Sequence, residues 1–185
     1  MHDSASAAAS GAASGFQRPR APRLPAGVSL RPVEDRDAAA LIALVDALYR
    51  DYPGCILLVE QEEPELLAPA RAYAPGGGWW VAEGEGRLLA SIAVRPSAYR
   101  PGWGELRKLY VEGRAQGRGL GQALLAFAEA EMDARGWRRR HLWTDSRFDA
   151  AHRLYTRAGW HRLPLTRMLD DASNTTEFEF VKQTG

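Results

Sequence analysis

Three glycines at alternate positions, Gly117, Gly119 and Gly121, separate a strand-like stretch from a helix-like stretch in the segment GRAQGRGLGQALL. A helix that begins near Gly119 leaves its first N–H groups without partners inside the helix, and its dipole is positive at that end. Glycine has no Cβ, so the backbone of such a loop can approach a ligand closely. The spacing therefore indicates a cradle for a phosphate group, the alternative being a loop that binds nothing.

Two common phosphate-binding patterns fit this segment poorly. A Walker A loop needs Gly-Lys followed by Ser or Thr, whereas Gly121 precedes Gln122 and Ala123. A dinucleotide-binding fold needs G-x-G-x-x-G directly after a strand, and an acid about twenty residues later. Asp145 offers such an acid, but the glycines run G-x-G-x-G and residues 112–116 separate them from the strand. Dinucleotide binding therefore remains the weaker alternative.

A third pattern fits better. Residues 116–121 read Q-x-x-G-x-G after a strand ending in Leu-Tyr-Val, and they resemble the acyl-CoA-binding motif of the GNAT superfamily of N-acetyltransferases. The later segment AHRLYTRAGW resembles the family's A-x-x-L-Y-x-x-x-G-F, with Trp160 in place of Phe. The expected order of elements between residues 28 and 181 is also that of the family. The resemblance thus covers nearly all of the chain outside its N-terminal segment.

Hydrophobic periodicity and turn residues predict the elements that must position these motifs. They indicate an α/β fold, with a central mixed sheet flanked by helices, as the resemblance to GNAT acyl-CoA N-acyltransferases also implies. Ser146 and Asp149 predict a capping box at the start of the last helix. The first helix should bury a stripe formed by Ala39, Ile42, Val45, Ala47 and Leu48. The expected strands are 28–33, 79–83, 88–94, 105–112, 141–145, 160–165 and 176–181, and the main expected helices are 34–50, 120–135 and 146–159.

The resemblance implies how acetyl-CoA, the co-substrate, would be held without a metal. In this family the strand before the glycines is splayed from its neighbour by a bulge, and its backbone pairs with the pantetheine arm and the thioester carbonyl. Here that backbone belongs to Leu109, Tyr110 and Val111. The pyrophosphate would lie on backbone N–H groups, with Gln116 opening the motif. These groups are those of Gly117, Arg118, Gly119, Leu120, Gly121 and Gln122.

The resemblance also implies the reaction, in which a primary amine attacks the thioester directly through a tetrahedral intermediate. Tyr155 matches the family tyrosine that can protonate the departing thiolate, although it could equally pack in the core. A base must remove a proton from the ammonium, and Glu105 is the first candidate. If its strand is regular, Glu105 shares a face with Arg107, Leu109 and Val111. Asp145 and His141 are second choices, and His152 is expected on the surface.

One position departs from the family pattern. Many members carry Asn seven residues before the tyrosine, where it contacts the pantetheine, and this chain carries Phe148 there. That departure, with the unassigned base, leaves open a CoA-binding regulatory module with little or no catalysis.

The acceptor is expected to be a small-molecule or protein amine. Aromatic residues suit the wall of its site, although they also fill ordinary cores. Acidic residues before residue 66 could attract a cation, although such residues more often form a solvated face. The aromatic residues are Tyr49, Tyr52, Trp79, Trp80, Tyr99 and Trp103, and the acidic ones are Glu60, Glu62, Glu63 and Glu65.

Composition bounds the remaining possibilities. A formal net charge of +1 gives no electrostatic case for nucleic acid or an anionic membrane. The single cysteine, Cys55, excludes an internal disulfide and suits a cytoplasmic protein. Residues 1–27 are rich in Ala, Ser, Pro and Arg and are expected to be a disordered tail before one domain, 28–185. The oligomeric state is open, and a homodimer is one option.

Overall fold

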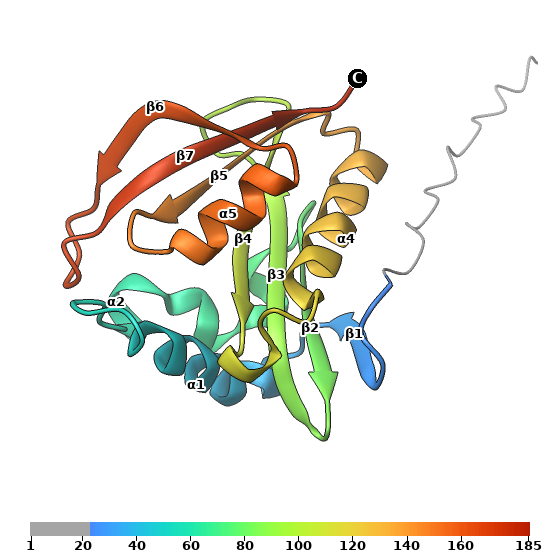
Figure 1. The fold of residues 1–185 in the computed structure, drawn as a ribbon, viewed down its shortest axis with the longest axis vertical. Coiled ribbons are helices and arrows are strands. Elements are labelled where there is room, and N and C mark those ends of the chain that lie inside the picture. Colours follow the sequence, from blue (N-terminus) through green and yellow to red (C-terminus); the bar gives the residue numbers. More distant parts are fainter. Residues whose placement is uncertain (1–22) are drawn as a thin grey trace, which may run out of the picture.

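Seven strands form one mixed sheet in the computed structural model, which describes residues 23–185. The strand order is β1-β2-β3-β4-β5-β7-β6, and within this sheet only β4 and β5 are parallel neighbours (Figure 1). This confirms the expected fold class and each expected strand, with shifted ends. The strands are β1 (Val28–Pro32), β2 (Gly78–Gly84), β3 (Arg87–Pro96), β4 (Trp103–Val111), β5 (Arg139–Asp145), β6 (His161–Met168) and β7 (Thr176–Gln183).

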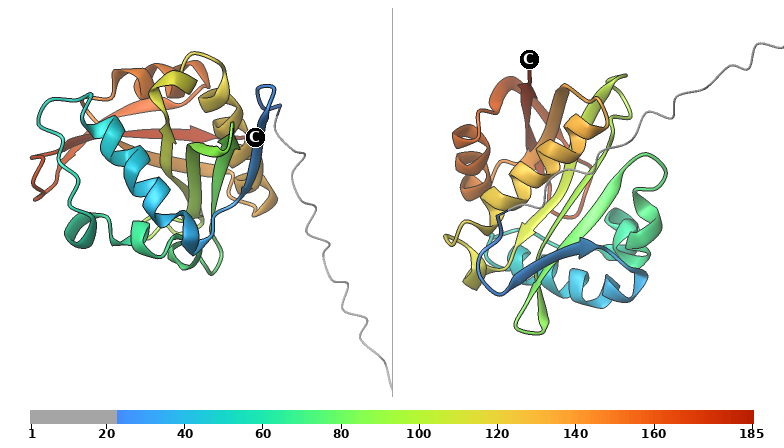
Figure 2. Two further views of the ribbon diagram at one scale, coloured as in Figure 1. Left: turned by 90° about the horizontal axis from the view of Figure 1, so that it is seen from below. Right: turned by 90° about the vertical axis from the view of Figure 1, so that its right-hand side faces the viewer.

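Helices cover both faces of the sheet (Figure 2). On one face, α4 (Leu120–Ala134) and α5 (Asp149–Arg157) pack over a core that includes Leu124 and Phe180. On the other face, α1 (Ala38–Tyr49) packs over a second core that includes Leu41 and Val81. The sheet, which contains Glu105 and leads into the glycine loop, therefore lies between two separately packed cores.

Short helical turns join the main elements. Prolines begin two of them, as expected for a segment that cannot form a longer helix. Within the described chain, no helix combines the length and apolar character needed to cross a membrane. The short elements are η1 (Asp35–Asp37), α2 (Val59–Glu62), η2 (Pro64–Leu67), α3 (Pro69–Ala72) and η3 (Gly113–Ala115).

A bulge interrupts β4 at Lys108, whose φ is +54°. Opposite it on β3, Ala93 pairs with Arg107 whereas Ser91 pairs with Tyr110, so one residue of β3 faces two of β4. The Ser91 hydroxyl donates a 2.7 Å hydrogen bond to the Lys108 carbonyl and fixes this geometry.

The bulge moves the side chains after it to the opposite face. Leu109 and Val111 pack into the α4 core, whereas Tyr110 packs into the α1 core. Arg107 remains beside Glu105. The expectation that Leu109 and Val111 share a face with Glu105 is therefore wrong, because the strand is not regular.

Two smaller expectations are also wrong. Helix α5 begins at Asp149 with Phe148 as its N-cap, and no side chain makes a capping hydrogen bond there. In α1 the fully buried residues are Leu41, Leu44 and Val45, so the buried stripe has a different register from the expected one. The expected tail boundary at residue 27 stays a prediction, because residues 1–22 lie outside the described part. Within residues 23–27, Leu24 packs against the core.

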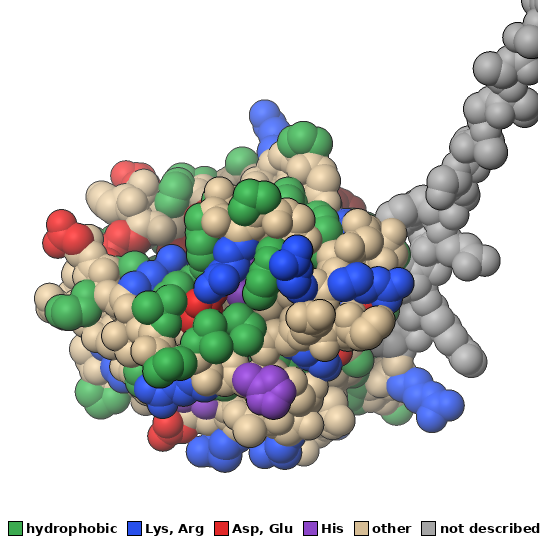
Figure 3. All heavy atoms as spheres, turned by 90° about the horizontal axis from the view of Figure 1, so that it is seen from above, with side chains coloured by type: hydrophobic (Ala, Val, Ile, Leu, Met, Phe, Trp, Pro, Cys, Tyr) green, Lys and Arg blue, Asp and Glu red, His purple; other side chains and the backbone are tan. Residues whose placement is uncertain are grey.

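Strands β4 and β5 pair only at their first three residues. Trp103, Gly104 and Glu105 face Arg139, Arg140 and His141, and the strands diverge beyond them. Seen from above, the molecule shows basic side chains interspersed with hydrophobic ones, and acidic side chains are less prominent on this face (Figure 3).

A buried histidine, His141, lies where β4 and β5 separate. His141 is fully buried, and its Nδ1 and Nε2 lie 2.9 Å from the Tyr99 hydroxyl and 2.8 Å from the Ser97 hydroxyl. The Trp143 indole N–H donates to the same Tyr99 oxygen, so we assign the Tyr99 proton to His141 Nδ1. Nε2–H then donates to Ser97. Burial lowers the pKa of His141 to about 4, so the ring is neutral at pH 7.

This assignment makes stability depend on pH. An unfolded histidine titrates near ~6.5, so between that pH and the folded pKa of about 4 the unfolded chain binds the extra proton. Stability should therefore fall as the pH is lowered. Between pH ~7.5 and ~5, we expect wild type to lose about 2 kcal/mol more free energy of unfolding than His141→Gln, measured by urea titration. Equal losses would show that His141 is not held neutral.

Candidate active site

A cavity of about 1130 Å³ occupies the space between the diverging strands. Its walls come from the second half of β4, the end of β5, helix α5, the glycine loop and the loop after α1. Because β4 has no strand partner on this side beyond Glu105, its backbone N–H and C=O groups are available to a ligand there.

The glycine loop forms one end of this cavity. Gly117 and Gly119 have φ of +71° and +82°, which side chains other than glycine rarely adopt, and an added Cβ would meet nothing within 4 Å. Gly119 is the N-cap of α4, and no side chain caps it. The helix thus presents open N–H groups to the cavity. The Gln116 side-chain amide donates a 3.0 Å hydrogen bond to the Val111 carbonyl, which ties the loop back to β4.

The remaining residues of the glycine segment differ in what they present to the cavity. A Cβ on Gly121 would lie 3.4 Å from Leu154 of α5 and 3.6 Å from Val111 of β4, so this glycine allows the three elements to approach. The Leu120 side chain is buried in the core, and the exposed Arg118 side chain does not line the large cavity. Gln122 lines it. The side chains of Arg118 and Leu120 are therefore directed away from this cavity.

Tyr155 reaches the cavity from α5. Its side chain is 5% exposed and packs near Phe180 and Trp160, with ring centroids 5.7 and 6.3 Å away. Among the described residues, no hydrogen bond holds its hydroxyl group. Burial raises the pKa of this phenol, so it keeps its proton at neutral pH and can donate it in a hydrogen bond.

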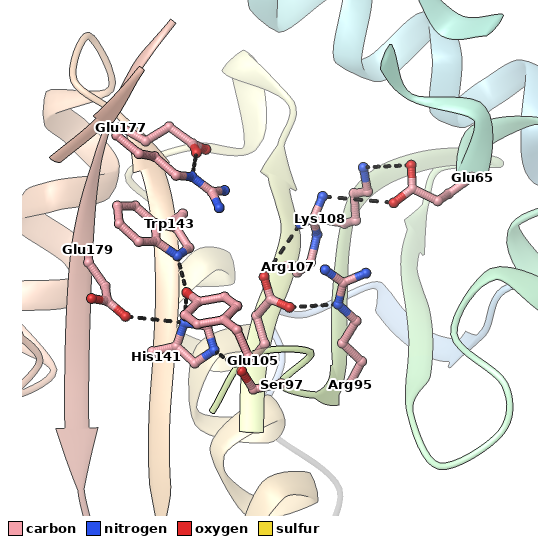
Figure 4. A network of polar contacts seen from close by, with 12 residues as sticks. Glu65, Arg95, Ser97, Glu105, Arg107, Lys108, His141, Trp143, Glu177 and Glu179 are labelled. Carbon is pink, nitrogen blue, oxygen red and sulfur yellow. Dashed lines mark hydrogen bonds and ion pairs between the residues drawn. The ribbon is translucent and has the colours of Figure 1, made fainter. Parts of the chain in front are cut away.

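Glu105 lies at the base of the cavity, where β4 and β5 separate (Figure 4). One carboxylate oxygen, Oε2, accepts a 2.6 Å hydrogen bond from Arg95. Among residues 23–185, the other oxygen, Oε1, contacts the Arg107 guanidinium, at 3.4 Å. Burial opposes ionisation, but the neighbouring Arg95 and Arg107 outweigh it and lower the pKa of Glu105. The group is an ionised carboxylate with one largely unoccupied oxygen.

The two second-choice bases are engaged elsewhere. Both His141 ring nitrogens are hydrogen-bonded, and the side chain does not line the cavity. Asp145 lines the cavity but pairs with Arg147 through contacts of 2.5–3.1 Å. His152 is not the surface residue expected, because its Nε2 lies 2.9 Å from the Asp145 carbonyl and its ring stacks on Phe180. Glu105 is therefore the best placed of the three candidate bases.

Aromatic side chains line part of the cavity. Of the six expected for the acceptor site, Tyr49 and Tyr52 line it, whereas the other four do not. Phe148, where many family members carry Asn, lines the cavity and packs against Tyr52 with ring centroids 4.7 Å apart. Phe148 therefore extends an aromatic wall. Burial raises the pKa of Tyr49 to about 12, so its phenol is neutral.

Two segments far apart in the sequence meet over the mouth of the cavity. The Ile56 N–H donates to the Ser173 hydroxyl at 2.8 Å, and that hydroxyl donates to the Ile56 carbonyl at 3.1 Å. The Ala172 N–H donates to Glu62 at 2.8 Å. The β6–β7 loop thus lies beside the segment after α1 at the cavity.

Two basic residues next to Glu105 were not assigned to the site from the sequence. Arg107 and Lys108 both line the cavity, and the bulge brings these neighbours together. Lys108 is 2% exposed at its side chain, contacts Glu63 and lies 3.7 Å from Glu65. Burial lowers the pKa of Lys108, but the two carboxylates favour its charged form. A regular alternation would place these two basic residues on opposite faces, so the sequence pattern gave no signal for their proximity.

Comparison with known proteins agrees with this geometry. The family model described as "Acetyltransferase (GNAT) family" matches residues 41–160. Mycothiol acetyltransferase of Streptomyces avermitilis is 31% identical over 140 residues, which are 75% of this chain and 44% of that protein. The mycothiol acetyltransferase of Thermobispora bispora is 34% identical over 153 residues, covering 77% and 49% of the two chains. This chain spans less than half the length of these curated relatives.

Solved structures share the fold. A GNAT-family acetyltransferase from Staphylococcus aureus Mu50 has a TM-score of 0.70 at 16% identity, covering 84% of this chain and 98% of that one. An acetyltransferase from Streptococcus agalactiae 2603 also has a TM-score of 0.70, at 18% identity, with 86% and 99% covered. The splayed strands, the glycine loop at the start of α4 and the matched family model lead to one conclusion: the chain belongs to the GNAT family of acetyltransferases.

Proposed function

We propose that this protein transfers the acetyl group of acetyl-CoA to a primary amine. The observation that carries the proposal is the cavity between β4 and β5, which joins the open N-terminus of α4 to the Tyr155 side chain and the Glu105 carboxylate. The family membership and the relatives named as acetyltransferases support it. We also propose that residues 28–185 form one catalytic domain.

The residues present fit acetyl-CoA. Backbone N–H groups of residues 117–122 would hold the pyrophosphate, since the positive helix end favours an anion and the glycines leave room for it. The unpaired edge of β4 at Leu109, Tyr110 and Val111 would bind the pantetheine arm by main-chain hydrogen bonds. Acetyl-CoA supplies an acetyl group activated as a thioester, which an amine can displace.

Two side chains would move the protons. Glu105 Oε1 would take one proton from the acceptor ammonium, directly or through water, so that the nitrogen lone pair is free to attack. Tyr155 would donate its hydroxyl proton toward the sulfur as the carbon–sulfur bond breaks. A backbone N–H at the exposed edge of β4 would stabilise negative charge on the carbonyl oxygen.

Replacing Gly119 with Ala tests the phosphate cradle. The φ of +82° strains any side chain, so relaxation of the loop should turn N–H groups away from the ligand. We expect acetyl-CoA affinity, measured by titration calorimetry, to fall at least about tenfold, by ~1.4 kcal/mol or more.

Gly136→Ala is the matched control. Gly136 has φ of +76°, lies just beyond the other end of α4 and has open space around it, so the same strain arises away from the cavity. Its acetyl-CoA affinity should match wild type. No acetyl-CoA binding by wild type, above all with NADH binding present, would reject the acetyltransferase proposal in favour of the dinucleotide alternative.

Tyr155→Phe tests catalysis separately from binding. No hydrogen bond within residues 23–185 is lost when the hydroxyl is removed, so folding should be preserved. We expect kcat to fall by roughly a hundredfold, with acetyl-CoA affinity unchanged. Steady-state release of the CoA thiol with a panel of amines measures kcat, and titration calorimetry measures acetyl-CoA affinity. Binding without turnover in wild type would instead support the regulatory module.

A further inference from the structure

The guanidinium group of Arg107 has few partners on the protein. Its side chain is 25% exposed and lines the cavity beside Glu105. Within the described chain, its side-chain hydrogen bond is the long one of 3.4 Å to Glu105 Oε1, and Glu65 lies 3.8 Å away. A guanidinium carries five N–H donors in a fixed fork. Most donors of this largely buried group therefore face the cavity region without a protein acceptor.

Other arginines in this structure show what is missing at Arg107. Arg31 binds Asp37 with two hydrogen bonds of 2.8 and 2.7 Å. Arg100 binds Glu179 in the same way, at 3.0 and 2.8 Å. Such two-pronged pairing with a carboxylate is the geometry that a guanidinium favours. Arg107 therefore lies in the cavity as a fork without such a two-pronged partner.

The nearby carboxylates do not form such a two-pronged pair with Arg107 in this structure. Glu105 is held by Arg95 at 2.6 Å, and Glu65 lies 3.7 Å from Lys108. Glu63 contacts Lys108. Figure 4 shows Arg95, Glu105, Lys108 and Glu65 converging from β3, β4 and η2, the turn after α2. The carboxylates around Arg107 therefore each have another basic side chain of the protein as a neighbour.

The group of charges around Arg107 is balanced. It contains three basic and three acidic side chains, namely Arg95, Arg107, Lys108, Glu63, Glu65 and Glu105. A ligand that brings only a positive charge, or only a negative one, would leave an uncompensated charge in a largely buried place. A ligand that brings one positive and one negative charge would leave the net charge of this region unchanged.

Glu105 and Arg107 also offer complementary free groups side by side. Oε1 of Glu105 has no described contact closer than 3.4 Å, and the fork of Arg107 has unused donors. An ammonium suits the first and a carboxylate suits the second. The arrangement matches a zwitterion.

We propose that the acceptor is an amino acid or a related amine that also carries a carboxylate, and that Arg107 binds this carboxylate while Glu105 faces the amine. This rests on the proposed acetyl transfer and names the class of its acceptor. Arg107 is thereby a specificity-determining residue. Lys108 and Glu63 hold the neighbouring turn in place around it.

A panel of matched acceptors tests the proposal at saturating acetyl-CoA. The panel contains L-leucine, L-phenylalanine, β-alanine and 4-aminobutyrate, each beside its carboxamide, which keeps the amine but removes the negative charge. We expect kcat/KM for at least one free acid to exceed that of its amide tenfold or more. Arg107→Gln should remove this preference, because it should raise KM for the acid at least tenfold more than KM for the amide, whereas any change at the neighbouring Glu105 affects both acceptors alike.

Two further variants make the result specific. Arg107→Lys keeps the charge without the fork, and it should restore only part of the affinity for the acid. Arg71→Gln is the matched control, because Arg71 is 83% exposed and lies outside the cavity, so its kinetics should equal those of wild type.

The outcomes separate this inference from the proposed function. Transfer to amides or simple amines as efficiently as to the acids, transfer to none of the acids, or an unchanged acid preference in Arg107→Gln would each overturn the inference. In the first two cases, acetyl-CoA binding by calorimetry would still support the proposed function. Failure of acetyl-CoA to bind would instead reject both.

Discussion

The divergence of β4 from β5 is the constraint on which the rest of the structure depends. Parallel pairing ends after Glu105, and the cavity, the exposed β4 edge and the access of Tyr155 to that edge all follow. Two features hold the strands in this arrangement. The bulge at Lys108 redirects β4, and the buried ring of His141, bonded to Tyr99 and Ser97, closes the point of separation. Both features leave backbone N–H and C=O groups of β4 free that would otherwise be paired within the sheet.

The bulge has a second effect, on charge rather than shape. By bringing Arg107 and Lys108 to one region, it places two basic side chains beside Glu105 and the turn that carries Glu63 and Glu65. Acidic residues that could attract a cation are then largely neutralised by contacts within the protein. In this region of near-zero net charge, one carboxylate oxygen and one guanidinium group have only long contacts with the described part of the protein. Such a region would distinguish ligands by the arrangement of their charges and not by their net charge.

The two ends of the cavity use different chemistry. At the glycine loop, the proposed binding of the pyrophosphate would use the main chain, so the conformation of Gly117 and Gly119 would matter more than the identity of Arg118 or Leu120. Elsewhere in the cavity, side chains form the wall and would determine which ligand fits, including the aromatic pair Phe148 and Tyr52. Backbone recognition suits a group common to every reaction of a family, whereas side chains can change between members without disturbing the sheet.

The sequence by itself determined the fold class, the order of strands and helices, and the place of the glycine loop before α4, because periodicity and glycine are local signals. It also pointed to Tyr155, Glu105 and the backbone of residues 109–111, which the structure brings to one cavity. Only the tertiary structure decided which faces these residues occupy. A single bulge reverses the alternation after Lys108, and no local pattern encodes it. The aromatic role of Phe148, the neutral state of His141 and the unmatched Arg107 arise from contacts between segments distant in the chain, which is why sequence reasoning could not reach them.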